Sequence, residues 1–145
     1  MIIPDANLLL YAYDSRSDLQ PAASQWLAEA FSGADTVGLP WISIGAFLRI
    51  STNHRIGSAI PMAKAVQIVE EWLARRSVRI IVPGERHWSL LKEVLVAGRI
   101  QGANTTDAQL AALTMEHGGV LYTADSDFAR FPGLRWKNPL QMKSN

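Results

Sequence analysis

The apolar positions of this chain form two kinds of segment. Short continuous apolar runs predict buried strands, and they alternate with longer segments whose apolar residues recur at helical spacing. This alternation is typical of an α/β domain, a three-layer α/β/α sandwich with a mainly parallel central sheet. We expect one domain over residues 1–140 and a C-terminal tail at 141–145. The strands are predicted at 2–3, 36–39, 78–83, 120–123 and 134–136, and the helices at 5–14, 21–33, 40–52, 61–76, 84–100 and 104–119.

Helical periodicity also predicts which side chains point into the core. The predicted inward faces carry Trp41, Ile44, Phe47 and Leu48 in the helix at 40–52, Met62, Val66, Val69 and Leu73 at 61–76, and Trp88, Leu91, Leu95 and Val96 at 84–100.

Acidic residues lie just past the ends of two predicted strands. Asp5 comes just after the first strand, Asp125 comes just after the fourth, and Asp127 lies two residues beyond it. Asp107 lies in the first turn of the helix at 104–119. Ligands of parallel α/β sheets bind beyond the carboxyl ends of the strands, so these acids are predicted to share one edge.

Clustered carboxylates repel one another unless a cation lies among them. Oxygen ligands favour Mg²⁺, with Mn²⁺ as the alternative ion, and such an ion activates water for attack on a phosphodiester. Taken singly, the same acids have ordinary explanations as helix caps, first-turn acids or turn residues. Three polar residues are candidates for supporting the carboxylates or holding water, and they too have explanations as local caps: Asn7, Thr106 and Thr123.

Composition narrows the chemistry further. The chain has 145 residues and a formal net charge of +1, so any basic surface for nucleic acid must be local. It contains no cysteine and only three scattered histidines, which excludes disulfides and a cysteine-based zinc site. The start of the chain lacks the basic segment of a signal peptide, and no apolar run reaches the roughly 18 residues of a membrane span. We therefore expect a cytoplasmic protein without membrane contact.

Four stretches together resemble a known family. They are DANLLLYA at 5–12, AFLRISTN at 46–53, TTDAQLAAL at 105–113 and VLYTADSDF at 120–128. Each is short, but their order, spacing and strand–helix context resemble the PIN domain, and in particular the VapC toxins of bacterial toxin–antitoxin pairs.

The resemblance implies a Mg²⁺-dependent endoribonuclease whose acids lie at one end of a parallel sheet. Asp5, Asp107 and Asp125 match acids of the family and are the implied catalytic residues. The same three acids, together with the neighbouring Asp127, are the implied metal ligands. The resemblance further implies an RNA substrate cut by a metal-activated water, a cognate VapB-like antitoxin that neutralises the toxin, and a homodimer.

One position departs from the family pattern. A glutamate is expected in the helix at 40–52, but the matching residue is Ala46, and no Asp or Glu occurs from 36 to 69. An alternative is therefore a catalytically weakened PIN domain that binds RNA or a protein partner without cleavage. A second alternative is a haloacid-dehalogenase-type phosphatase, which also places an Asp after its first strand. That chemistry needs a second Asp where this chain has Asn7.

Two arginines are the best candidates for contacts with RNA phosphates. Arg49 lies near the end of the helix predicted at 40–52, which starts at the end of the second strand, and Arg55 ends the polar stretch at 51–55. Solvent-exposed surface charge is the competing explanation for both.

Overall fold

The computed structural model describes residues 1–141, so residues 142–145 of the predicted tail lie outside the described part. Its centre is a five-stranded sheet with the order β3-β2-β1-β4-β5, in which every pair of neighbouring strands is parallel. The prediction of a parallel α/β sheet is confirmed. The strands are β1 (Ile2–Pro4), β2 (Val37–Pro40), β3 (Val78–Ile81), β4 (Val120–Tyr122) and β5 (Trp136–Lys137).

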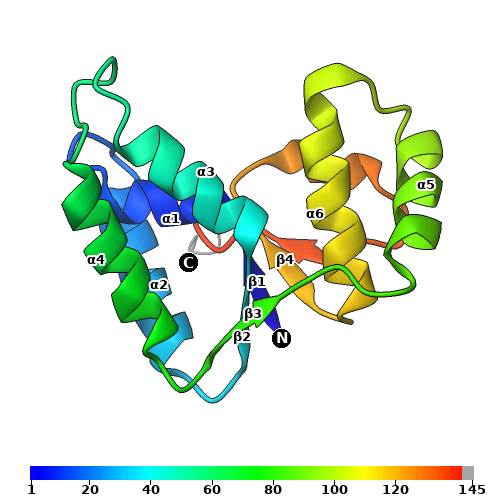
Figure 1. The fold of residues 1–145 in the computed structure, drawn as a ribbon, viewed down its shortest axis with the longest axis horizontal. Helices are drawn as coiled ribbons and strands as arrows, with labels where there is room; N and C mark the ends of the chain where they lie inside the picture. Colours follow the sequence, from blue (N-terminus) through cyan, green and yellow to red (C-terminus); the bar gives the residue numbers. More distant parts are fainter. Residues whose placement is uncertain (142–145) are drawn as a thin grey trace.

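Helices cover both faces of the sheet (Figure 1). Helices α1 to α4 pack on one face and helices α5 and α6 on the other, which gives the predicted three layers. No helix in the described part of the chain is long and apolar enough to span a bilayer. The helices are α1 (Ala6–Tyr13), α2 (Gln20–Ser32), α3 (Trp41–Ser51), α4 (Met62–Leu73), α5 (His87–Ala97) and α6 (Thr105–Glu116), with 3-10 turns η1 (Gly102–Asn104) and η2 (Ser126–Arg130).

Local sequence signals set the ends of several helices. Pro21 lies in the first turn of α2, where its missing N–H costs nothing. Gly118 follows α6 with a φ of +64°, a conformation that glycine adopts without steric penalty. The turn after α6 lets β4 begin at Val120, directly beside β1.

An aromatic cluster joins the helices on the α1–α4 side. Phe47 of α3 is fully buried, and its ring centroid lies 4.7 Å from that of Trp72 of α4. Tyr13 of α1 contacts both rings, and its hydroxyl accepts a 3.2 Å hydrogen bond from the Trp72 indole. This cluster fixes α3 relative to α1, the two helices that border the site described below.

The predicted inward face of α4 is wrong. Of the four residues expected there, Met62, Val66 and Leu73 are exposed and only Val69 is buried. The buried stripe is offset by about one residue, because the large Trp72 ring packs into the aromatic cluster and turns the helix. It consists of Ala65, Ile68, Val69 and Trp72.

The predictions for two tryptophans are also wrong. Trp88 of α5 is 65% exposed and Trp41 of α3 is 58% exposed. Helix α5 is an outer element with Val94 as its one fully buried residue, and Val96 is 80% exposed. Leu91 and Leu95 are partly buried and pack against the core, so this part of the predicted inward face is confirmed. Periodicity overestimated burial here because an outermost helix needs only a narrow contact with its neighbour α6.

The two tryptophans Trp72 and Trp88 provide a matched test of the packing. Because Trp72 is only 3% exposed, Trp72→Ala is expected to lower the free energy of unfolding by about 3–5 kcal/mol. Trp88→Ala is expected to cost less than about 1 kcal/mol, since it removes a mostly exposed side chain. Urea denaturation measures both values, and equal losses would contradict the assigned core.

Candidate active site

The strand order of the sheet creates a topological switch point beside the central strand β1. From the central strand β1, the chain proceeds to β2 and β3 on one side, whereas β4 and β5 lie on the other side. Asp5 follows β1 and Asp125 follows β4, so both lie at the carboxyl edge beside this switch point. Parallel α/β sheets bind their ligands at such points.

Asp5 caps α1 and is also tied to β4. Its Oδ1 accepts a 2.7 Å hydrogen bond from the Ala6 N–H, and its Oδ2 accepts a 2.8 Å bond from the Thr123 hydroxyl. The backbone N–H of Asp5 donates to the carbonyl of Tyr122 at 2.9 Å. Asp5 therefore acts as the N-cap of α1, as its ordinary explanation states. Its hydrogen bond with Thr123 is an additional, long-range contact that capping does not explain.

Thr123 is the fully buried connector of this group. Besides donating to Asp5, its hydroxyl oxygen accepts from the Asn7 side-chain amide at 3.1 Å and from the Asp125 N–H at 3.0 Å. Asn7 in turn accepts a 3.3 Å bond from the Ala124 N–H. The hydroxyl thus makes three hydrogen bonds, which fix the side chain of Asp5 and the start of the loop with Asp125.

Asp107 approaches from the opposite layer. Asp5, Thr106 and Asp107 line one small pocket of about 40 Å³, which is completed by residues of α3 that include Ala46. This volume is enough for a water molecule. The structure therefore brings the start of α1 and the start of α6 to one place, with an alanine methyl where the family resemblance implies a carboxylate.

The remaining two acids, Asp125 and Asp127, do not line this pocket, but their charges act on Asp107. Asp125 is half-buried and caps η2, where its Oδ1 accepts a 2.9 Å bond from the N–H of Asp127. Asp127 is exposed. Turn formation thus accounts for part of the Asp125 geometry, as its ordinary explanation anticipates.

Burial and mutual repulsion both oppose full ionisation of the carboxylates. Burial raises the pKa of Asp5 from 3.8 to about 6, against the lowering effect of its hydrogen bonds with Thr123 and Ala6, and the negative charges of Asp107 and Asp125 raise it further. The pKa of Asp107 is also raised, by burial first and then by the charges of Asp125 and Asp127, while Arg130 opposes the shift. The four acids are therefore one interacting electrostatic group.

The donor atoms suit a hard cation, but they do not surround one tightly. Among residues 1–141, no three His, Asp or Glu side chains form a group that could hold a metal ion. Mg²⁺ commonly keeps several waters and uses only one or two protein carboxylates, so a hydrated ion is compatible with this spacing. The predicted ligand set Asp5, Asp107, Asp125 and Asp127 stays a prediction.

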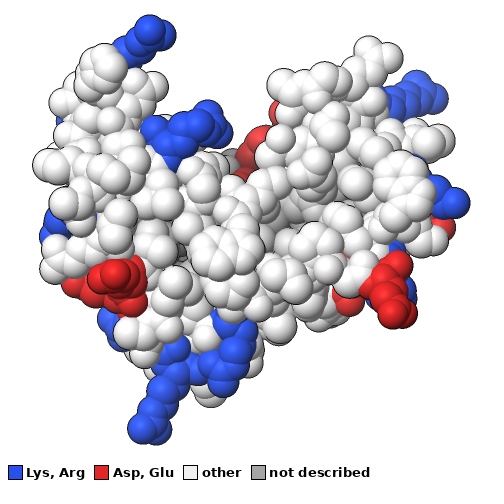
Figure 2. Space-filling view, in the orientation of Figure 1, with Lys and Arg blue, Asp and Glu red and all other residues white. Residues whose placement is uncertain are grey.

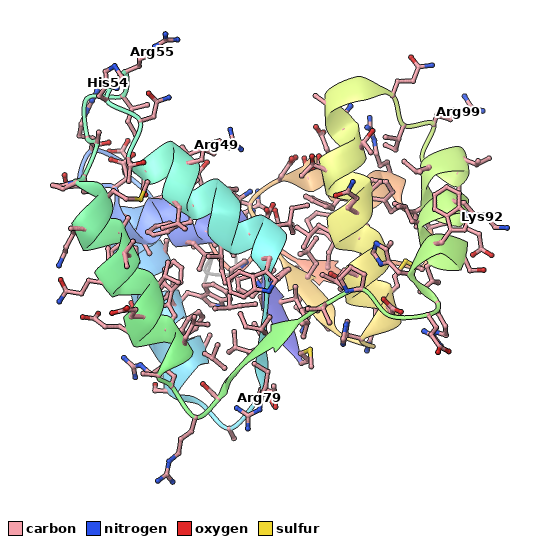
Figure 3. All side chains as sticks on the ribbon, in the orientation of Figure 1. Arg49, His54, Arg55, Arg79, Lys92 and Arg99 are labelled. Carbon is pink, nitrogen blue, oxygen red and sulfur yellow. The ribbon has the colours of Figure 1, made fainter. Side chains whose placement is uncertain are left out.

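Helices α3 and α6, which both contribute to the small pocket, also border a hollow of the molecular surface. Figure 2 shows a depression between the arm that carries α3 and the arm that carries α6, with acidic side chains on its wall and basic side chains on its rim. Arg49 projects from α3 toward this hollow, whereas Arg55 lies farther out in the loop after α3 (Figure 3). Both arginines are exposed, and their predicted role in RNA binding stays a prediction.

Sequence reasoning missed one residue that shapes the site. Ser43 is 2% exposed, and its hydroxyl donates a 3.2 Å hydrogen bond to the carbonyl of Pro4. This bond ties the first turn of α3 to the end of β1, next to Asp5. The available signal was a serine beside Ile44 on the apolar side of a helix, since a buried hydroxyl requires a partner.

Comparison with known proteins gives consistent results. The profile of the PIN domain family matches residues 2–134. Ribonuclease VapC37 of Mycobacterium tuberculosis (strain ATCC 25618 / H37Rv) is 39% identical over 140 residues, covering 96% of this chain and 97% of the relative. Ribonuclease VapC33 of the same strain is 37% identical over 142 residues, covering 97% and 99%.

Solved structures show the same fold at lower sequence identity. VapBC2 from Rickettsia felis, bound to a DNA fragment from its promoter, matches with a TM-score of 0.68 and 18% identity, covering 95% of this chain and 98% of the other. VapC20 of Mycobacterium tuberculosis, described as a sarcin–ricin loop cleaving toxin, matches with a TM-score of 0.67 and 20% identity, covering 93% and 99%. With the family profile spanning the domain and relatives above 30% identity over nearly the whole length, the chain belongs to the PIN domain family, among the VapC proteins.

Proposed function

We propose that this protein is an endoribonuclease toxin of a toxin–antitoxin pair, which hydrolyses RNA phosphodiester bonds with a divalent cation, Mg²⁺ or Mn²⁺. The observation that carries the proposal is the shared pocket of Asp5 and Asp107, two carboxylates whose pKa values are both raised in part by the charge of Asp125. The curated relatives with the highest identity cited above are named ribonucleases, which supports RNA as the substrate class.

The residues that would hold the cation are Asp5, Asp107, Asp125 and Asp127. When bound, the ion supplies an activated water and neutralises charge on the phosphate. Thr123 holds Asp5 through its hydroxyl, and Asn7 holds Thr123. These contacts keep the Asp5 carboxylate in one orientation, which lowers the cost of organising the site.

Two protein partners belong to the proposal. Several structural neighbours are VapBC complexes, which supports a VapB-like antitoxin as the partner that neutralises this chain. A homodimer is supported by the exposure of Trp41, Trp88 and Val96, large apolar side chains that a second copy would cover.

Ala46 favours a second candidate function. Because its methyl group lines the pocket beside Asp5 and Asp107, the cation has one fewer candidate ligand than the family pattern implies. The alternative is a domain that binds RNA or a protein partner without cutting. Binding of RNA with no turnover in Mg²⁺ and in Mn²⁺ would favour this alternative over the ribonuclease.

The raised pKa of Asp5 predicts a pH-dependent stability. The pKa of Asp5 in the folded protein is about 6, above the usual value of 3.8, so the folded protein holds the carboxyl proton more tightly than the unfolded chain does. The protein therefore loses stability as the pH rises from 3.8 through about 6. Asp5→Asn removes the buried charge. The free energy of unfolding of the variant, relative to that of the wild type, is expected to increase by about 1–3 kcal/mol from about pH 4 to pH 7, because only the wild type loses this stability. Chemical denaturation across this range measures it, and a difference that does not change with pH would contradict the electrostatic assignment.

Loss of a carboxylate of the pocket is expected to abolish cleavage. Asp5→Asn and Asp107→Asn are expected to reduce Mg²⁺-dependent cleavage of RNA by at least about 100-fold, more than the loss of a mere supporting residue. They are also expected to weaken Mg²⁺ binding in calorimetric titration. Asp35→Asn is the matched control, since Asp35 is exposed and precedes β2 at the opposite edge of the sheet. Cleavage that persists in EDTA, or Mg²⁺ affinity equal to that of wild type in Asp107→Asn, would overturn the metal assignment.

The hydroxyl of Thr123 is expected to matter in its own right. Thr123→Val keeps the shape but removes the donor to Asp5, so Mg²⁺ affinity and cleavage are expected to fall by about 10- to 100-fold. Thr123→Ser retains the hydroxyl and is expected to remain within a few-fold of wild type, at about 0.6 kcal/mol or less of lost transition-state stabilisation. Equal activity of the valine and serine variants would show that the hydrogen bond is dispensable.

A further inference from the structure

A second and much larger pocket lies beyond the carboxylates. It has a volume of about 590 Å³ and lies where the ends of α1 and α3 meet the loop after α3. Its size is within the range of pockets that hold small molecules or single nucleotides. Its lining includes Tyr11, Asp14, Arg16, Ser51, Arg55 and Ile56.

The pocket combines apolar walls with positive charge. Tyr11 and Ile56 contribute an aromatic and an aliphatic surface, while Arg16 and Arg55 contribute two exposed guanidinium groups. Asp14 is the one acid of the lining, and its carboxylate accepts a 3.0 Å bond from the backbone N–H of Arg16. The lining therefore carries a net positive charge beside an apolar surface.

One wall of the pocket holds a polar group without a partner. Ser51, at the end of α3, is 8% exposed, and its hydroxyl has no hydrogen-bond partner among the described residues. A buried hydroxyl without a partner is unfavourable, so an acceptor or donor supplied from the pocket would be favoured there.

A glycine allows one guanidinium to lie close to the loop. A methyl group built on Gly57 would overlap the Arg16 guanidinium, which therefore packs directly over the backbone of the loop after α3. The position of Arg16 thus depends on the absence of a side chain at residue 57.

Two helices connect this pocket to the carboxylates. Helix α1 begins beside Asp5 and reaches the pocket at Tyr11, six residues on, which is about 9 Å at the helical rise. Helix α3 carries Ala46 at the carboxylate pocket and Ser51 at the large pocket. Arg49 lies between these two residues of α3 and projects toward the hollow (Figure 3).

We propose that the large pocket is a subsite for a nucleotide of single-stranded RNA, next to the bond that is cleaved. This rests on the proposed function, because it assumes that the strand lies across the carboxylates. The base packs against Tyr11 and Ile56 and offers a polar edge to Ser51, while Arg16 and Arg55 contact the phosphates.

Charge favours RNA over a protein segment as the occupant. Two guanidinium groups beside an aromatic wall suit an alternation of phosphates and bases, and the Arg49 rim provides positive charge between this pocket and the acids. A protein segment that filled the same pocket would need its own acidic groups for these arginines.

The test measures RNA binding and cleavage separately in the full chain. Binding of a labelled single-stranded RNA octamer is followed by fluorescence anisotropy in the Asp5→Asn background, and kcat and KM are measured in the otherwise wild-type protein. Arg55→Ala, Ser51→Val and Gly57→Ala, which displaces Arg16, are each expected to weaken binding by about 3- to 10-fold, with a corresponding rise in KM and little change in kcat. Lys92→Ala is the control, because Lys92 projects from α5 away from the hollow (Figure 3).

The outcomes separate this proposal from the proposed function. RNA binding unchanged in Arg55→Ala and Gly57→Ala, in a protein that still cleaves RNA through Asp5 and Asp107, would overturn the subsite and leave the ribonuclease intact. Weakened binding of the antitoxin in these variants, with RNA binding unchanged, would overturn it in favour of a protein site. Absence of Mg²⁺- or Mn²⁺-dependent cleavage in the wild type would instead refute the ribonuclease itself.

Discussion

The hydrogen bond from Thr123 to Asp5 joins the carboxyl ends of β1 and β4, and the geometry of the site depends on it. Asp5 is half-buried at the switch point of the sheet, where an ionised carboxylate is costly without donors. The Thr123 hydroxyl and the Ala6 N–H supply those donors, while Asn7 and the Asp125 N–H fix the hydroxyl. One short network therefore fixes the first acid, the start of α1 and the loop that carries Asp125.

These hydrogen bonds offset only part of the cost of the charge. Burial and the neighbouring acids still leave the pKa of Asp5 at about 6, so the site opposes the full ionisation of its own carboxylates. Such unfavourable charge is typical of sites that bind a cation, where stability of the free protein is lower than it could be. Ala46 changes this balance: a methyl group in the small pocket spares the site one more negative charge and removes one candidate ligand.

Much of this architecture could be predicted from the sequence, because strands and helices differ in the period of their apolar residues. The positions of Asp5 and Asp125 at one edge followed from the rule for parallel sheets, and Asp107 from the start of its helix. The inward face of α4 and the outward positions of Trp88 and Val96 in α5 could not be predicted, since Met62 and Trp88 are as apolar as the residues that are buried. Neighbouring elements decide which stripe packs. The bond of Ser43 to Pro4 and the large pocket beside Ser51 likewise depend on long-range contacts that no local pattern encodes.

The most direct test of the account is the titration of the Asp5 side-chain carboxyl by carbon-detected NMR, without and with Mg²⁺. We expect a pKa near 6 in the absence of the ion and a lower pKa in its presence, because a bound cation favours the ionised form. A carboxyl that titrates near its usual 3.8 and does not respond to Mg²⁺ would contradict the claim that Asp5 is the central residue of a cation-dependent site.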